Sequence, residues 1–195
     1  YRQNNEIKIN PKGTFDDDLD TLPFPLWEKW QLQGYWSAGY AHAPVKRKSK
    51  FLPILSSRGC PYRCTFCVSP TLNPTWRMRS AKNVVDEMEY FYLKMGITDF
   101  HFSDLDPTVN SERTKEICKQ LIMKKMPIEW KLSQGTKIET VKDVETVGLM
   151  QKAGLTFFSF SPESGSKELM KKLKKPFDYE HAIKILKELN RLDIK

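Results

Sequence analysis

Three cysteines lie close together at Cys60, Cys64 and Cys67, in the spacing C-x3-C-x2-C. Thiolates bind zinc and iron, and three of them on one short loop can converge on a single metal centre. Structural zinc sites and four-cysteine iron–sulfur clusters each need a fourth ligand. Three ligands leave one iron of a 4Fe–4S cluster with an open coordination position, where a substrate or cosubstrate can bind. The spacing therefore favours an open iron–sulfur site.

Other interpretations of the cysteines compete with this one. A structural disulfide would leave an odd cysteine and requires an oxidising compartment, for which the sequence carries no signal. Zinc could be completed by Cys118 or by a histidine, although no second C-x2-C follows at zinc-finger spacing. The three could also be buried structural residues, but Cys-Pro-Tyr-Arg-Cys is typical of a loop. Cys118 lies beside Ile117 in an expected helix and is interpreted as a core residue.

The positive charge of the chain is local. The 195 residues carry 32 Lys and Arg against 24 Asp and Glu, a formal net charge of +8. Nine of those cations lie between residues 44 and 82, a stretch that has no Asp or Glu, so the rest of the chain is close to neutral. A general affinity for nucleic acid is therefore not expected. We expect the Arg and Lys of this stretch to lower the thiolate pKa values and to stabilise a reduced cluster.

Strands and helices alternate after residue 50. Strands are expected at 51–56, 99–103, 128–133 and 156–161, and helices at 81–95, 111–125, 141–153, 166–174 and 179–192, with a further strand starting at 193–195. Such alternation predicts βα units and a parallel sheet, because parallel neighbours need a crossover connection. An open doubly wound sheet and an incomplete barrel both fit. The cysteines directly follow the first strand, where α/β folds carry their sites.

Residues 1–50 show no sustained helical or strand period. They hold an acidic run, a segment with Pro23 and Pro25, and an aromatic-rich stretch at 27–40. We interpret them as a linker whose aromatic side chains pack on the following domain. The chain begins with Tyr1 and has no signal peptide or stretch of about 20 apolar residues, so we expect a piece of a longer protein without a transmembrane segment.

The cysteine segment resembles the cluster-binding motif of the radical S-adenosylmethionine (radical SAM) superfamily, including the aromatic Phe66 before the last cysteine. Residues 58–62, the linker-like segment 18–25 and residues 76–80 followed by Glu87 resemble the subset that carries an N-terminal cobalamin-binding domain. The resemblance implies an α/β fold, a partial (β/α)6 TIM-like barrel. It implies a linker at 1–50 after a missing, cobalamin-binding domain, and a radical SAM core at 51–195 that is truncated at its C-terminal end.

In that superfamily a 4Fe–4S cluster cleaves S-adenosylmethionine reductively and yields a 5′-deoxyadenosyl radical, so the cofactor carries the difficult chemistry. The resemblance makes Cys60, Cys64 and Cys67 the cluster ligands and places Phe66 near the adenine. Glu163 would contact the ribose hydroxyls, and strand alternation puts Ser161 on the same face, with Phe158 and Phe160 on the other. The alternative for Glu163 is that it caps the next helix.

Asp104 falls where the family places a group that binds the methionyl amine. Many relatives have a second carboxylate directly after it, whereas this chain has Leu105, so Asp104 and Asp106 are both candidates. The alternative for Asp104 is an Asx turn leading into Pro107. Lys137 could pair with the methionyl carboxylate or be an ordinary surface lysine.

Two further features have plain structural interpretations. His101 is interpreted as a structural histidine rather than an inward-facing acid or base. The lysines at 171, 172, 174 and 175 are interpreted as a solvated helix end, favoured there by the helix dipole.

The resemblance implies a cytoplasmic radical SAM enzyme, with a cobalamin-dependent methyltransferase acting on a small-molecule or lipid precursor as the leading hypothesis. Its cofactors would be a 4Fe–4S cluster, S-adenosylmethionine and cobalamin, and its electron donor a protein such as flavodoxin or ferredoxin. One alternative is a radical methylthiotransferase-like enzyme acting on tRNA, although a basic RNA-binding appendage and a second cysteine set are missing. The alternative from another class is a zinc-bearing nucleic-acid-binding module.

Overall fold

The computed structural model describes residues 1–11, 13–39, 41–46, 49–72, 75–175 and 177–195. Tyr40, Arg47 and Lys48, which belong to the aromatic and basic stretches above, lie outside the described residues. The strands of the described part are β1 (Arg2–Gln3), β2 (Glu6–Ile7), β3 (Phe51–Ile54), β4 (Ser57–Arg58), β5 (Arg77–Met78), β6 (Asp99–Phe102), β7 (Glu129–Thr136) and β8 (Leu155–Phe160). The α-helices are α1 (Leu32–Ala38), α2 (Ser69–Leu72), α3 (Ala81–Met95), α4 (Ser111–Lys124), α5 (Val144–Lys152), α6 (Lys167–Lys172) and α7 (Tyr179–Arg191).

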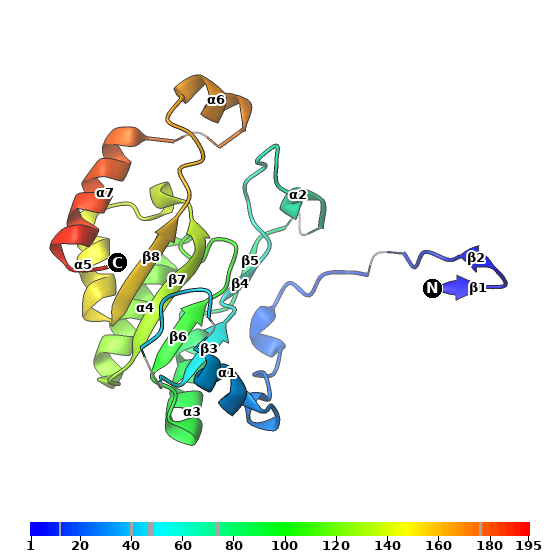
Figure 1. Ribbon diagram of the computed structural model, residues 1–195, viewed down its shortest axis with the longest axis horizontal. Helices are drawn as coiled ribbons and strands as arrows, with labels where there is room; N and C mark the ends of the chain where they lie inside the picture. The colour runs from blue at the N-terminus through cyan, green and yellow to red at the C-terminus, as the bar shows by residue number, and fades with distance from the viewer. Residues whose placement is uncertain (12, 40, 47–48, 73–74, 176) are drawn as a thin grey trace.

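The main sheet has the order β3-β6-β7-β8, and each neighbouring pair is parallel. Phe51 pairs with Asp99, and Asp99 pairs with Glu129, so the first three strands start level with one another. Figure 1 shows that α2 and α6 both lie beyond the C-terminal ends of these strands. The loops that follow the strands therefore meet at one edge of the sheet.

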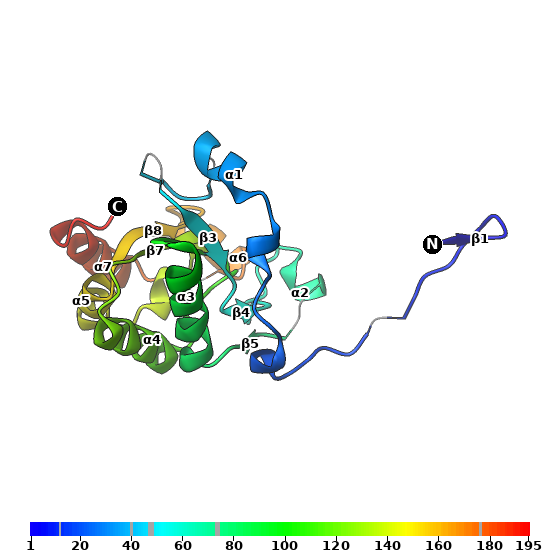
Figure 2. The same cartoon turned by 90° about the horizontal axis from the view of Figure 1, so that it is seen from below.

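The long helices α3, α4, α5 and α7 lie on one face of the sheet, and α1 lies on the other side (Figure 2). An open doubly wound sheet carries helices on both faces, whereas successive units of a barrel put them all outside. Because the strand order also follows the chain order, the arrangement is that of a partial barrel, as predicted. No helix in the described ranges combines the length and the apolar character needed to cross a bilayer.

Helix α3 shows why these segments fold as expected. The Oγ of Ser80 accepts a hydrogen bond from the Asn83 N–H at 3.1 Å and caps its first turn. Gly96 ends it with φ +67°, a conformation that glycine adopts without strain. Val84 and Phe91 are completely buried against the sheet. The predicted apolar stripe is therefore the face that packs on the core.

The C-terminal strand predicted at 193–195 is not a regular strand. However, the Lys195 N–H donates to the Thr156 carbonyl at 3.1 Å, and the Phe158 N–H donates to the Lys195 carbonyl at 2.7 Å. The last residue thus pairs with the free edge of β8. A single paired residue is too short for a regular strand.

Two other stretches contain elements that the sequence pattern did not predict or placed differently, although Phe24, Trp27 and Trp36 of residues 1–50 pack on the core as predicted. Residues 1–50 contain the helix α1 and the β1–β2 hairpin, which stands apart from the rest of the chain in Figure 1. Helix α1 has only seven residues, too few to show a period. Its Trp36 Nε1 donates to the Phe51 carbonyl at 2.9 Å, whereas Tyr35 is 60% exposed. The helix predicted at 141–153 starts at Val144 and is preceded by a 3-10 turn, Ile138–Thr140.

Candidate metal centre and its surroundings

The three neighbouring cysteines lie on the loop between β4 and α2, at the C-terminal edge of the sheet. Cys60 and Cys64 are partly buried, and Cys67 is exposed. The Cys67 N–H donates to the Cys64 carbonyl at 3.1 Å, and the Thr65 N–H donates to the Leu173 carbonyl at 3.0 Å, just after α6. The loop is therefore tied to the segment that follows the last strand.

Burial raises the pKa of the Cys60 and Cys64 thiols, and the neighbouring thiols raise it further. Lys175 and Lys137 oppose this for Cys64 and lower its pKa. The expectation that cations of the 44–82 stretch lower the thiolate pKa values was thus wrong. Arg79 of that stretch forms a buried ion pair with Glu87 instead.

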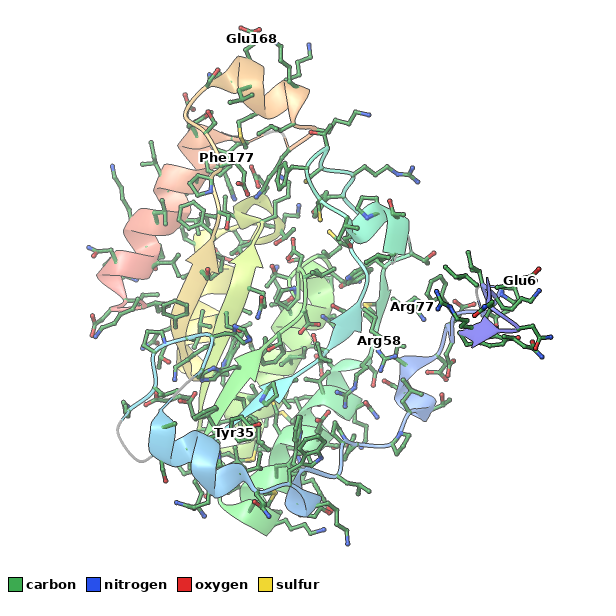
Figure 3. All side chains as sticks on the ribbon, turned by 45° about the vertical axis from the view of Figure 1, so that its right-hand side comes forward. Glu6, Tyr35, Arg58, Arg77, Glu168 and Phe177 are labelled. Carbon is green, nitrogen blue, oxygen red and sulfur yellow. The ribbon has the colours of Figure 1, made fainter. Side chains whose placement is uncertain are left out.

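Arg77, another cation of that stretch, is also used elsewhere. Its guanidinium donates to the Asp16 carbonyl. Arg58 of β4 and Arg77 of β5 are paired residues of the short antiparallel β4–β5 ribbon (Figure 3). Arg77 therefore connects this ribbon to the N-terminal segment.

The alternative interpretations of the cysteines find no support. None of the four forms a disulfide. Cys118 is completely buried on α4, and burial raises its pKa to about 12, so it is a core residue and no ligand for the loop. In the described part of the chain no three His, Cys, Asp or Glu side chains are grouped around a common metal position.

Asp104, directly after β6, is 1% exposed and belongs to a network made by its own chain. Its Oδ2 accepts from the Ser56 N–H at 3.1 Å, and its Oδ1 accepts from the hydroxyls of Ser56 at 2.9 Å and Ser57 at 2.6 Å. Arg113 donates to the Ser56 carbonyl at 2.7 Å. We call these four residues the Asp104 network. The Asx turn considered for Asp104 is not formed, because its partners precede it in the chain.

Asp106 is equally buried but differently bonded. Its Oδ1 accepts from the Thr108 N–H at 3.3 Å and from the hydroxyls of Thr108 at 3.2 Å and Thr140 at 3.4 Å. Its Oδ2 is buried and has no hydrogen bond of normal geometry in the described part of the chain, although the Lys137 backbone lowers the pKa of the carboxyl. Burial outweighs these bonds and raises the pKa to about 6. The charge of Asp106 raises the pKa of Cys60, so this carboxylate is close to the cysteine loop.

Lys137 follows β7 and is no ordinary surface lysine, because its side chain is only 12% exposed. Its Nζ donates to Glu139 Oε2 at 2.7 Å and lies 5.4 Å from the ring centre of Tyr62, which is in the cysteine loop. Glu139 Oε1 in turn accepts from the Asp178 N–H at 3.0 Å. These contacts join the loops after β7 and α6 to the cysteine loop.

Ser161 and Glu163 lie on the loop directly after β8. Gly135 has φ +73°, and a Cβ on it would lie 2.8 Å from Ser161 Oγ, so the end of β7 and the loop after β8 pack closely. Lys175 Nζ donates to the Ser161 carbonyl at 2.8 Å and to Glu163 Oε1 at 2.6 Å. The cap of α6 is Ser166, whose Oγ accepts from the Leu169 N–H at 3.3 Å. The capping alternative for Glu163 was therefore wrong.

The solvated-end interpretation of the lysine run is wrong for Lys175, whose side chain is 11% exposed. Because the run contains four lysines within five residues, the sequence does not indicate which of them is buried. Phe66 is 56% exposed at the tip of the cysteine loop. Phe158 is buried in the core, and Phe160 packs against it and stacks on Phe177, which Figure 3 labels near α6.

His101 is a structural residue, as predicted. It is 3% exposed, its Nε2 lies 3.1 Å from Asp99 Oδ1, and its ring stacks on Phe51. Lys131 Nζ completes a buried ion pair with Asp99. This group lies near the N-terminal ends of the strands, away from the cysteine loop.

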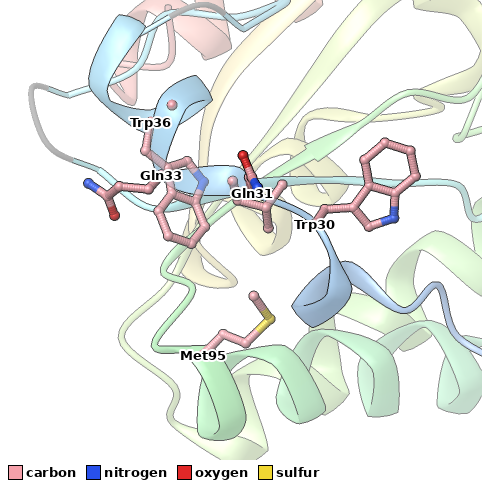
Figure 4. Close-up of a pocket in the computed structure, with 7 residues that line it drawn as sticks. Trp30, Gln31, Gln33, Trp36 and Met95 are labelled. Atoms are coloured by element: carbon pink, nitrogen blue, oxygen red, sulfur yellow. The ribbon is translucent and has the colours of Figure 1, made fainter.

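Two cavities are lined in part by the N-terminal segment, at residues 19–36. One of about 550 Å³ lies between α1 and the end of α3, and Trp36 and Met95 are among the side chains that line it (Figure 4). A second, of about 210 Å³, lies between the N-terminal segment and β3, and includes Trp27, Leu55 and Arg58. Neither includes a cysteine.

Comparisons with known proteins agree with this arrangement. The Radical SAM superfamily matches residues 54–195. Cytidylyl-2-hydroxyethylphosphonate methyltransferase of Streptomyces wedmorensis is 30% identical over 185 residues, which are 92% of this chain and 34% of that protein. Anaerobic magnesium-protoporphyrin IX monomethyl ester cyclase of Cereibacter sphaeroides is 31% identical over 136 residues, which are 68% of this chain and 22% of that protein.

The fold is also that of a solved enzyme. The radical S-adenosylmethionine methyltransferase TsrM from Kitasatospora setae, solved with cobalamin and a [4Fe-4S] cluster bound, matches with a TM-score of 0.66 and 21% identity. The match covers 76% of this chain and 30% of TsrM. The chain thus spans about a third or less of the length of each of these three proteins. On its sequence and its fold, this chain belongs to the radical SAM superfamily.

Proposed function

We propose that this chain is the cluster- and cosubstrate-binding part of a cobalamin-dependent radical SAM methyltransferase that acts on a small-molecule or lipid precursor. The observation that carries the proposal is the C-x3-C-x2-C loop at the C-terminal edge of a partial barrel, next to the buried carboxylate of Asp106, one oxygen of which has no hydrogen bond of normal geometry to any described residue. The methyltransferases among the matching proteins support the choice of reaction.

The donor set fits a 4Fe–4S cluster that keeps one open iron. Cys60, Cys64 and Cys67 would hold it, because the loop offers three thiols and Cys118 is in the core. When bound, the cluster supplies the electron for reductive cleavage of S-adenosylmethionine. The protein's own part is to hold the cosubstrate, to keep water away and to present the substrate.

The carboxylate proposed to take the methionyl ammonium is Asp106 rather than Asp104. Among the described residues, no group forms a hydrogen bond of normal geometry to the buried Oδ2 of Asp106, whereas both oxygens of Asp104 accept from its own chain. An ammonium group would satisfy that oxygen and offset the burial of the charge. Lys137, held beside Tyr62, is proposed to face the methionyl carboxylate.

The nucleoside half of the cosubstrate would lie across the loop after β8. Glu163 and Ser161 are proposed to contact the ribose, because Lys175 holds both at one turn. Phe66, exposed at the tip of the cysteine loop, would cover the adenine. Burial of its ring would then exclude water from the site.

The remaining assignments follow the proposed reaction. An electron donor such as flavodoxin or ferredoxin would reduce the cluster, and the protein would work in the cytoplasm. Cobalamin would be held by a domain before residue 1, with residues 1–50 as the linker to it. Residues 51–195 would be the core domain, which continues beyond the present C-terminus.

The test is anaerobic reconstitution of the full-length protein with iron and sulfide, followed by reductant and S-adenosylmethionine. We expect iron and sulfide in the ratio of a 4Fe–4S cluster, and 5′-deoxyadenosine or methylated cobalamin as product. Cys67→Ala should lose both the cluster and the products. Cys118→Ala is the matched control and should keep the iron.

Retention of zinc alone, together with unchanged activity in Cys67→Ala, would reject the proposal in favour of a zinc-binding module. A cluster without cobalamin binding, and sulfur transfer to tRNA, would instead assign the chain to a methylthiotransferase.

A further inference from the structure

The backbone at Glu163 is held in a conformation that a glutamate seldom adopts. Its φ is +50°, in the left-handed region, and it lies in the exposed turn between β8 and α6. Such positions persist only where the surroundings hold them, and they are concentrated at ligand-binding sites. Without a tether, an exposed carboxylate in a loop would sample many positions.

The tether is the ammonium group of Lys175. It donates to the Ser161 carbonyl at 2.8 Å and to Glu163 Oε1 at 2.6 Å, so one group bonds to both ends of the turn. Its side chain is 11% exposed, whereas Lys171 and Lys174 of the same run are exposed residues. The ammonium group is thus largely shielded from solvent and forms hydrogen bonds to two oxygens of the same turn, which fixes the position of the turn.

The segment that carries Lys175 also holds the cysteine loop. The Leu173 carbonyl, two residues before Lys175, accepts from the Thr65 N–H at 3.0 Å. The segment 173–175 therefore forms hydrogen bonds both to the turn at Glu163 and to the cysteine loop.

We infer that Lys175 is a positioning residue, which holds the carboxylate of Glu163 at the orientation that binds the ribose of the nucleoside cosubstrate. With Oε1 held by Lys175, Oε2 is left to accept from a ribose hydroxyl. The inference rests on the proposed role of Glu163, and it assigns to a residue of the lysine run a function in binding that its sequence context does not indicate.

The experiment measures S-adenosylmethionine binding by equilibrium dialysis with the full-length, anaerobically reconstituted protein. We expect Lys175→Met to weaken binding about tenfold, a typical coupling for residues in direct contact. Lys175→Arg should recover most of the affinity, because Arg can donate to both oxygens. Lys171→Met is the matched control from the same run and should bind like the parent protein.

Glu163→Gln separates this inference from the proposed function. If Glu163→Gln binds S-adenosylmethionine as the parent does, the proposed role of Glu163 fails, and the inference fails with it. If Glu163→Gln weakens binding and Lys175→Met does not, only the inference is overturned. Adding Lys175→Met to Glu163→Gln should weaken binding no further, whereas additive losses would show that Lys175 acts independently of Glu163.

A second measurement does not depend on the cluster. Amide hydrogen exchange of the cluster-free protein should rise at 161–165 in Lys175→Met and stay unchanged in β7. The charge-swapped variant Glu163→Lys/Lys175→Glu should recover the protection only in part and the affinity not at all, because a glutamate at 175 can pair with a lysine at 163 but cannot donate to the Ser161 carbonyl. Unchanged exchange at 161–165 in Lys175→Met would overturn the inference even if that variant bound no iron.

Discussion

Two carboxylates that are two residues apart, Asp104 and Asp106, differ in what surrounds them. Both follow β6, and both are almost completely buried. The oxygens of Asp104 accept from Ser56 and Ser57, whereas in Asp106 only Oδ1 accepts hydrogen bonds of normal geometry from the residues that the structure describes. Burial raises the pKa of both, and that of Asp106 reaches about 6.

The difference separates a carboxylate that bonds within the fold from the one that we propose binds the cosubstrate. Asp104 and the Arg113 guanidinium bond to the same residue, Ser56, so the network joins β6 and α4 to the segment between β3 and β4. A buried acceptor without its full set of partners lowers the stability of the fold unless a ligand supplies the missing donor. Asp104 therefore contributes to the fold, and Asp106 is available to a cationic group.

The largest effect that tests this comparison is expected from Asp104→Ala. The variant removes the acceptor for three donors and leaves the Arg113 charge without its facing carboxylate. We expect the free energy of unfolding to fall by about 4 kcal/mol, because the remaining partners stay buried. Urea denaturation of the cluster-free protein measures it.

Asp106→Ala is the matched control, with the same deletion two residues away. It should lower the free energy of unfolding by less than about 1 kcal/mol, because the buried charge that it removes is itself unfavourable to folding and offsets the lost hydrogen bonds. Equal losses in the two variants would contradict the division between the two carboxylates.

A smaller effect is expected from pH. The pKa of Asp106 in the folded protein, about 6, lies above its ordinary value of 3.8, so folding disfavours the ionised form. The stability that is present at acid pH is then lost as the pH rises through 6. The side chain of Asp106→Asn carries no charge at any pH, so the stability of this variant should not fall in this way as the pH rises. We expect it to be more stable than the parent by about 2 kcal/mol near pH 7.5, and equal to it near pH 4.

The measurement is the difference in unfolding free energy between Asp106→Asn and the parent, both without cluster, at the two pH values. A difference that does not depend on pH would mean that Asp106 has an ordinary pKa in the folded protein. In reconstituted protein the same variant should bind S-adenosylmethionine more weakly, although it is more stable.

The sequence correctly predicted those features of the fold that depend on residues close together in the chain. The βα alternation, the caps of α3 at Ser80 and Gly96 and the position of the cysteine loop each depend on a few neighbouring residues. The sequence left open whether Asp104 or Asp106 binds the cosubstrate. That choice depends on which one meets Ser56 and Ser57, which are about fifty residues earlier in the chain.

Residues that act through tertiary packing could not be identified in the same way. Lys175 looks like its neighbours in the lysine run, and only the fold brings it to Glu163. The cations expected at the thiols lie mostly elsewhere, because Arg79 pairs with Glu87 on α3. Lys137 and Lys175, which do act on Cys64, come from loops after β7 and α6.

The smallest effect expected here concerns single hydroxyl groups. Ser57 is 3% exposed and donates to Asp104 Oδ1 at 2.6 Å, and Ser56 Oγ still serves that oxygen when Ser57 is changed. Ser57→Ala should therefore lower the free energy of unfolding by about 1 kcal/mol, the usual contribution of one hydrogen bond. The matched control is Ser69→Ala, because the Ser69 Oγ is also buried but has no partner among the described residues. Its removal should leave the stability unchanged or slightly raise it. If the two variants lose the same amount, burial of a hydroxyl rather than donation to Asp104 accounts for the loss, and the Asp104 network contributes less to the fold than its contacts indicate.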